Sequence, residues 1–76
     1  MKELLLILAR ALVSKPDAVL VNQVDRGHTV VLELHVAPDD VGKVIGKQGR
    51  RAQAIRSVMK AKAARDGRKV IVDIMS

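Results

Sequence analysis

Hydrophobic residues recur along the first half of the chain with two different periods. Glu3 to Ser14 consists mainly of Leu and Ala without Gly or Pro, and Pro16 follows, which predicts a helix. Ala18 to Val24 is rich in Val and Leu, and apolar residues alternate with period two from Thr29 to Ala37. These two stretches predict strands, joined by a hairpin turn at Asp25 to His28.

The second half predicts two helices and a strand. Pro38 and the two carboxylates after it predict a helix start, and that helix ends near Ile45. Arg50 to about Arg65 contains no helix breaker, Gly67 is a candidate stop, and Val70 to Met75 alternates as a last strand. The inward stripe of the long helix is predicted to be Ala52, Ile55, Met59 and Ala63. The element order predicts an α+β fold, a three-stranded sheet with three helices on one face.

The N-terminal helix is apolar on two sides. The stripe expected to face the core comprises Leu4, Leu5, Leu8, Ala11 and Leu12. Leu6, Ile7 and Val13 lie off that stripe, so they are either additional core residues or a protein interface.

Composition restricts the class of protein. With 76 residues the chain has room for one domain, residues 1–76, whose small core would benefit from self-association or a partner. The absence of Cys excludes disulfides, zinc ribbons and thiol catalysis, and we expect a cytoplasmic protein without a cofactor. The N-terminal apolar run is shorter than the roughly 20 residues of a membrane span and lacks a cleavage site, so we expect neither a membrane segment nor a secretory signal.

The charge is distributed unevenly. The net charge of +6 combines −2 over residues 1–42 with +8 over residues 43–76. A one-sided basic surface is typical of a protein that binds a polyanion, with nucleic acid as the first candidate. A solvated helix face that keeps a small protein soluble is the alternative.

A glycine-flanked turn between the two adjacent helices carries the candidate chemistry. Gly46 and Gly49 enclose Lys47 and Gln48, and the next helix begins directly after them. Its first free N–H groups point at whatever occupies the loop, and phosphate suits that position. Lys47 and Gln48 are expected to project from the tip toward phosphate or sugar oxygens. An ordinary tight turn is the structural alternative.

These residues also carry a family resemblance. Val44 to Gly49 resembles the V-I-G-x-x-G signature of KH domains, whose GXXG loop clamps about four nucleotides of a single strand. The element order is similar to the type II KH arrangement, and Val30 to Arg51 resembles the stand-alone bacterial KH proteins of the KhpA type, a match that extends over essentially the whole chain. The implied RNA-binding residues are Lys43, Val44, Ile45, Gly46, Lys47, Gln48, Gly49, Arg50 and Arg51.

The resemblance further implies single-stranded RNA as ligand, self-association as a homodimer, and pairing with a larger KH protein of the KhpB (Jag) type. In that family the pair is linked to cell elongation and division, which suggests an RNA chaperone or regulator. The chain has no aromatic residue on which to stack bases. A KH groove does not need one, because in that family an aliphatic floor lies under the bases, and the resemblance implies such a floor here. Its candidates are Val41, Val44, Ile45 and Ile55. Where many KH domains carry a large aliphatic residue, three positions after the second loop glycine, this chain has Ala52.

Other activities fit the residues less well. Gly42 to Lys47 lacks the spacing and the following Ser or Thr of a P-loop, and no hydroxyl lies in a nucleophile motif, so we expect a non-enzyme. Glu33 and His35 share a strand face, which predicts a solvated surface more readily than a metal site. Two binding alternatives stay open: a protein-interaction adaptor with incidental RNA binding, and a single-stranded DNA-binding protein.

Overall fold

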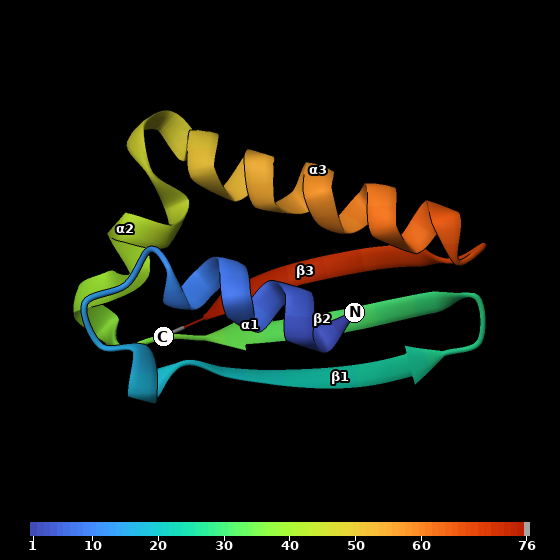
Figure 1. Ribbon diagram of the computed structural model, residues 1–76, viewed down its shortest axis with the longest axis horizontal. Helices are drawn as coiled ribbons and strands as arrows, with labels where there is room; N and C mark the ends of the chain where they lie inside the picture. Colours follow the sequence, from blue (N-terminus) through green and yellow to red (C-terminus); the bar gives the residue numbers. More distant parts are fainter. Residues whose placement is uncertain (76) are drawn as a thin grey trace.

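The computed structural model describes residues 1–75, so Ser76, the last residue of the predicted domain, lies outside the described residues. Figure 1 shows a sheet with helices packed on one of its faces. The elements are α1 (Lys2–Arg10), β1 (Leu20–Arg26), β2 (Thr29–His35), α2 (Val41–Ile45), α3 (Arg50–Arg65) and β3 (Lys69–Met75). The predicted α+β class and element order are confirmed.

Strand β2 lies at the centre of the sheet. It pairs antiparallel with β1 and parallel with β3, so the chain reaches β3 only after crossing over through α2 and α3. The alternation in β2 continues to Val36, just after the strand, and places four side chains in the core: Val30, Leu32, Leu34 and Val36. The hairpin is tighter than predicted, because Arg26 already pairs with Thr29 and only Gly27 and His28 form the turn.

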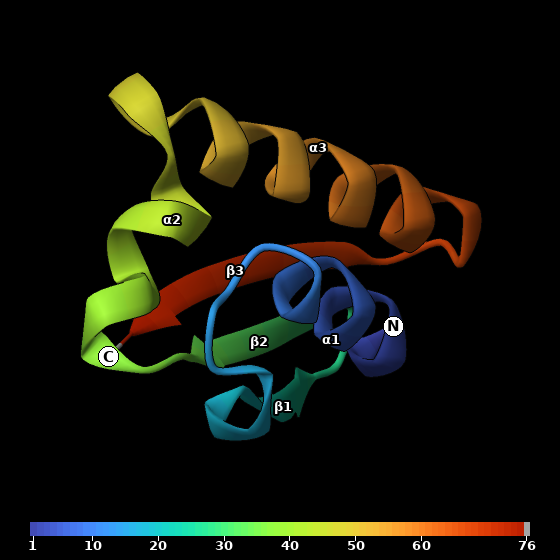
Figure 2. The same ribbon diagram turned by 60° about the vertical axis from the view of Figure 1, so that its left-hand side comes forward.

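The long helix α3 and the shorter α1 lie over the same face of the sheet (Figures 1 and 2). The whole predicted stripe of α3 is buried: Ala52, Ile55, Met59 and Ala63. Gly67 follows α3 as predicted, and the last turn closes with the Arg68 N–H donating to the Ala63 carbonyl at 2.8 Å. Among residues 1–75 no helix is long and apolar enough to cross a membrane.

Helix α1 differs from its prediction in length and in the face it buries. It ends at Arg10. The backbone N–H groups of Ser14 and Lys15 do not continue the helix but donate to a carboxylate on another element, which is described below. Ala9 is buried with Leu5, whereas Ala11 is exposed. Of the off-stripe residues, Leu6 and Val13 pack against the core, and Ile7 is 66% exposed.

Strand β1 begins later than predicted. Pro16–Ala18 forms a 3₁₀ turn, and pairing with β2 then continues from Leu20 as far as Arg26. Antiparallel pairing can extend up to a two-residue turn. The end of β1 at Arg26 is therefore set by its pairing with β2 and not by the local sequence pattern.

Candidate nucleic-acid interface

The loop between α2 and α3 has an unusual backbone. Gly46 has φ 75° and ψ 176°, a region that is essentially limited to glycine. Gln48 at φ 57° and Gly49 at φ 73° are both left-handed, which is costly for Gln48 because its Cβ crowds the following carbonyl. This loop holds a strained conformation, and strain of this kind is often concentrated at functional sites.

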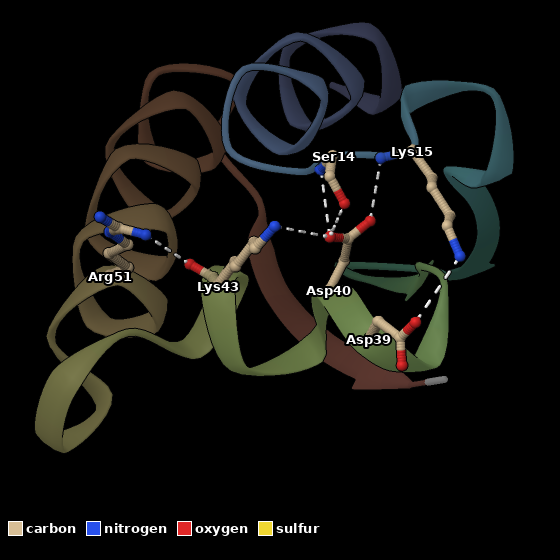
Figure 3. Close-up of polar contacts among 6 residues, drawn as sticks. All are labelled: Ser14, Lys15, Asp39, Asp40, Lys43 and Arg51. Atoms are coloured by element: carbon tan, nitrogen blue, oxygen red, sulfur yellow. Dashed lines mark hydrogen bonds and ion pairs between the residues drawn. The ribbon is translucent and has the colours of Figure 1, made fainter.

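Arg51 fixes the loop. Its guanidinium Nη1 donates to the Lys43 carbonyl of α2 at 2.9 Å (Figure 3). Its aliphatic stem lies against Gly46. A Cβ added at Gly46 would lie 2.7 Å from the Arg51 Cγ. Arg51 therefore positions the loop by joining α2 to α3, which is a structural task in addition to its predicted place in the interface.

A buried carboxylate holds the start of α2. The Asp40 side chain has no exposed surface. It accepts hydrogen bonds from the Ser14 N–H at 3.0 Å, the Ser14 hydroxyl at 2.7 Å and the Lys15 N–H at 3.0 Å (Figure 3). The Lys43 ammonium lies 3.6 Å from Asp40 Oδ1. The hydrogen bonds from Ser14 lower the pKa of Asp40 from 3.8 to about 2, so the carboxylate is charged at neutral pH.

The sequence predicts only a helix start at Asp40. The structure shows that it ties α2 to the segment after α1, and thereby sets the position of the loop that follows α2. The Ser14 and Asp40 positions are 26 residues apart, so no local pattern pairs them.

Exposed polar side chains surround the loop tip. Lys47, Gln48 and Arg50 are all exposed, and within residues 1–75 none of them makes a side-chain hydrogen bond or an ion pair. Lys43 is exposed beside them, and the first turn of α3 contains no acidic residue. The loop thus presents uncompensated positive charge next to the positive end of a helix dipole, a combination suited to an anion.

The predicted aliphatic floor is mostly inside the protein. Val44 is fully buried and Ile55 is 4% exposed, so these two side chains support the loop from the core and do not present a surface to a base. Val41 is half-buried, and Ile45 is 38% exposed. Ile45 is therefore the main apolar contact that the α2 side of the loop offers.

A groove that the sequence pattern does not predict runs between α3 and the edge strand β3. It encloses about 380 Å³ between Arg56 and Lys60 on the helix and Val70 to Asp73 on the strand. The Arg56 Nε and Nη2 atoms each donate to the Val72 carbonyl at 3.3 Å. The spacing of Arg56 and Lys60, four residues apart in a helix, is the sequence signal that indicates one basic face here.

Comparisons with known proteins agree with this architecture. The family model described as KhpA/KhpB, KH domain, matches residues 2–74. The RNA-binding protein KhpA of Clostridium perfringens is 55% identical over 75 residues, covering 99% of this chain and 100% of that protein. The RNA-binding protein KhpA of Caldanaerobacter subterraneus is 53% identical with the same coverage, and that of Chlamydia trachomatis is 44% identical over 99% of this chain and 96% of that protein. With its type II element order and its GXXG loop, the chain belongs to the KhpA/KhpB family of KH domains.

Proposed function

We propose that this protein binds single-stranded RNA and clamps the backbone of the strand with the loop Gly46 to Gly49. The observation that carries the proposal is the exposed loop tip, where Lys47 and Gln48 lack protein partners among the described residues and flank the start of α3. The relatives, each named an RNA-binding protein, support RNA as the ligand.

In this proposal the residues of the predicted interface have different tasks. The Lys47 ammonium and the free N–H groups at the start of α3 contact phosphate, with Lys43 and Arg50 adding to the field. Ile45 provides an apolar contact for a base, and Gly46, Gly49, Val44 and Arg51 hold the loop in shape. Without aromatic stacking, binding is weak and depends on salt, with log affinity falling by about 0.7 per phosphate neutralised for each unit of log salt.

The test is fluorescence anisotropy of a labelled single-stranded RNA, titrated with wild type and with the variant Lys47→Asp, Gln48→Asp. We expect the variant to keep its circular dichroism spectrum and lose most of its affinity, because three units of charge change at the phosphate contact. The control Lys2→Asp, Asn22→Asp has the same change in net charge on α1 and β1, and it should bind like wild type.

Two results would contradict the proposal. If the loop variant and the control bind equally, the loop is an ordinary turn and any RNA binding lies elsewhere, which favours the adaptor alternative. If a DNA oligomer of the same sequence competes better than the RNA, the ligand is single-stranded DNA.

We further propose that the protein works in the cytoplasm as a homodimer, or with a KhpB-type partner, as an RNA chaperone or regulator of the kind linked to cell shape. The family model, which unites KhpA and KhpB, supports this, and so does apolar surface on α1. Ile7 is largely exposed, and an apolar hollow of about 260 Å³ lies between Leu8 of α1, Leu12 just after α1, and Val58 of α3. Two weak RNA sites in one dimer would gain avidity through effective concentration.

Self-association is checked by sedimentation equilibrium over a range of protein concentrations. We expect the mass to rise from monomer to dimer, and Val58→Glu to keep it at the monomer value because a charge cannot be buried in an apolar contact. The matched substitution Val24→Glu, on the exposed face of β1, should leave the dimer intact. A strict monomer for the wild type at high micromolar concentration would refute the homodimer.

A further inference from the structure

One face of the sheet carries no helix among residues 1–75, because α1 and α3 both lie over the other face (Figures 1 and 2). The uncovered face, called the open face below, presents every second residue of each strand. These residues are Leu20, Asn22, Val24 and Arg26 of β1, Thr29, Val31, Glu33 and His35 of β2, and Lys69, Ile71, Asp73 and Met75 of β3. A parallel strand pair such as β2 and β3 is usually covered on both faces, so a partner is expected here.

Strand pairing arranges the open face in rows that cross the sheet. The apolar row consists of Val24, Val31 and Ile71, of which Val24 is 39% and Ile71 50% exposed. On one side of it lies a basic row, made of Arg26, Thr29 and Lys69. On its other side lies an acidic row, made of Asn22, Glu33 and Asp73, and beyond that a fourth row of Leu20, His35 and Met75. The open face therefore passes from positive through apolar to negative over about 13 Å, the length of four residues along a strand.

The charges of these rows are not paired within one copy of the protein. The ion pairs that the structure describes within residues 1–75 join other side chains. Glu33 and Asp73 are direct neighbours on β2 and β3, and like charges in that position repel each other. A partner that fits the open face therefore places cations over the acidic row and carboxylates over the basic row.

A second copy of the same chain has this distribution of charge. Two open faces can stack about 10 Å apart, as the sheets of a sandwich do, with a two-fold axis along the apolar row. The apolar rows then face each other, and each basic row faces the acidic row of the other copy. Lys69 lies over Asp73 of the second copy, and Arg26 lies over its Asn22, next to Glu33. A basic helix of another protein would match only the acidic row, and RNA would match only the basic row.

We propose that the open face is a contact between two copies of this protein, and that copies held close together on one RNA strand associate through it. Only the second part rests on the proposed function. The three central rows measure roughly 13 by 10 Å between residue centres, which is far less than the about 800 Å² that each partner buries in a stable complex. The contact is therefore transient in the free protein and forms where the effective concentration is high.

The open face is separate from the two sites proposed above. The loop and the hollow between α1 and α3 lie on the side of the helices (Figure 2). A copy can therefore use its loop, its α1–α3 surface and its open face at the same time. Because the two contacts between copies lie on opposite sides of the protein, alternating them extends an open row of molecules, which suits a long strand.

The test is cross-linking through single cysteines, which the natural chain lacks. Val24→Cys places a thiol in the apolar row, where it faces the same thiol of the second copy. Gln23→Cys, one residue earlier, places it on the other side of the sheet as the control. Both are made with Val58→Glu, which removes the α1–α3 contact. A bismaleimide with a reach of about 10 Å, the spacing of stacked sheets, joins the thiols. The rate of covalent dimer formation is divided by the rate with a monofunctional maleimide, which corrects for the reactivity of each thiol.

We expect Val24→Cys to cross-link several-fold faster than Gln23→Cys. Adding Lys69→Asp or Asp73→Lys to Val24→Cys should reduce its rate to that of the control, because like charges then face each other. A mixture of these two charge variants should restore the fast rate, because each supplies the charges that the other needs. Circular dichroism confirms that each variant folds.

The part that concerns RNA is tested with Val58 intact. An oligouridine of about 40 nucleotides has room for about ten four-nucleotide sites, whereas a tetramer has room for one. We expect the long oligomer to raise the cross-linking rate of Val24→Cys several-fold and the tetramer to leave it unchanged. Fluorescence anisotropy of the labelled long oligomer shows whether it is bound.

Each part can fail separately. Equal rates for Val24→Cys and Gln23→Cys, or a mixture that is no faster than the separate charge variants, would overturn the contact. If the long oligomer is bound but does not speed cross-linking, the part that concerns RNA is wrong. If no RNA is bound, the proposed function fails, while cross-linking of the free protein still decides whether the open face joins two copies.

Discussion

Replacing Gly46 by Ala should destabilise the protein by about 2–6 kcal/mol, because two separate costs add at this position. The backbone at φ 75° and ψ 176° costs about 1–3 kcal/mol for any residue with a Cβ. The new methyl group would also lie 2.7 Å from the Arg51 Cγ and 2.9 Å from its Cβ, and overpacking of this kind costs about 1–3 kcal/mol. A domain of 76 residues is stable by only about 4–11 kcal/mol.

Two other glycines of the same segment serve as controls. Gly49 has φ 73° but open space around its Cβ position, so Gly49→Ala should cost only the backbone term of about 1–2 kcal/mol. Gly42 lies in α2 with no close neighbour, and Gly42→Ala should stabilise the protein by about 0.5–1 kcal/mol. Urea unfolding followed by far-ultraviolet circular dichroism gives all three values. If Gly46→Ala and Gly49→Ala lower the free energy of unfolding equally, the contact between the new methyl group and Arg51 contributes nothing to the destabilisation.

The parts of the fold that were predicted correctly are those in which local pattern and tertiary environment agree. In α3 the stripe from Ala52 to Ala63 is buried, and every second residue is buried from Val30 in β2 to Val36 just after it. The period of the apolar residues is then sufficient to place them. The loop was also identifiable, because Gly46 to Gly49 is contiguous in sequence.

The predictions are wrong or incomplete where contacts between residues far apart in sequence determine the structure. The Ser14 and Lys15 N–H groups bind Asp40, and Leu12 makes a short-range bond to Ala9, so α1 ends four residues before the predicted Ser14. Likewise the Arg56 side chain donates to the Val72 carbonyl, 16 residues away, which links α3 to β3. Neither contact follows from periodicity, because periodicity describes one element at a time.

The loop of the proposed RNA interface contains features that folding stability alone would not favour. Gln48 is left-handed, Arg50 places a cation at a helix N-terminus, and Lys47 has no carboxylate near it among the described residues. The left-handed backbone of Gln48 and the cation of Arg50 cost folding free energy in the unbound protein. The positive charges of Lys47 and Arg50 become favourable if an anion occupies the loop, which is the pattern expected when a site is kept for binding.

Replacing Asp40 by Asn should lower the melting temperature clearly, although the side chains have nearly the same shape. Both carboxylate oxygens accept hydrogen bonds, Oδ1 from the Ser14 N–H and hydroxyl and Oδ2 from the Lys15 N–H. An amide offers one oxygen and one donor NH₂ group, so in either orientation a donor faces a donor in a site without exposed surface. The charge that attracts Lys43 is lost as well. Asp39 is 84% exposed in its pair with Lys15, so Asp39→Asn should change the free energy of unfolding by no more than about 0.5 kcal/mol.

The same substitution has a pH signature that separates the hydrogen bonds from mere packing. Because the folded protein holds the pKa of Asp40 at about 2 against 3.8, the stabilisation from its carboxylate is fully present above pH 3.8 and is lost as the pH falls toward 2. The difference in free energy of unfolding between wild type and Asp40→Asn should therefore be constant at neutral pH and shrink below about pH 4. Other carboxyl groups titrate in the same range, but they do so in both proteins and cancel in the difference. Urea unfolding at several pH values measures it. A difference that stays constant down to pH 2 would mean that the charge of Asp40 does not hold α2 against the segment after α1.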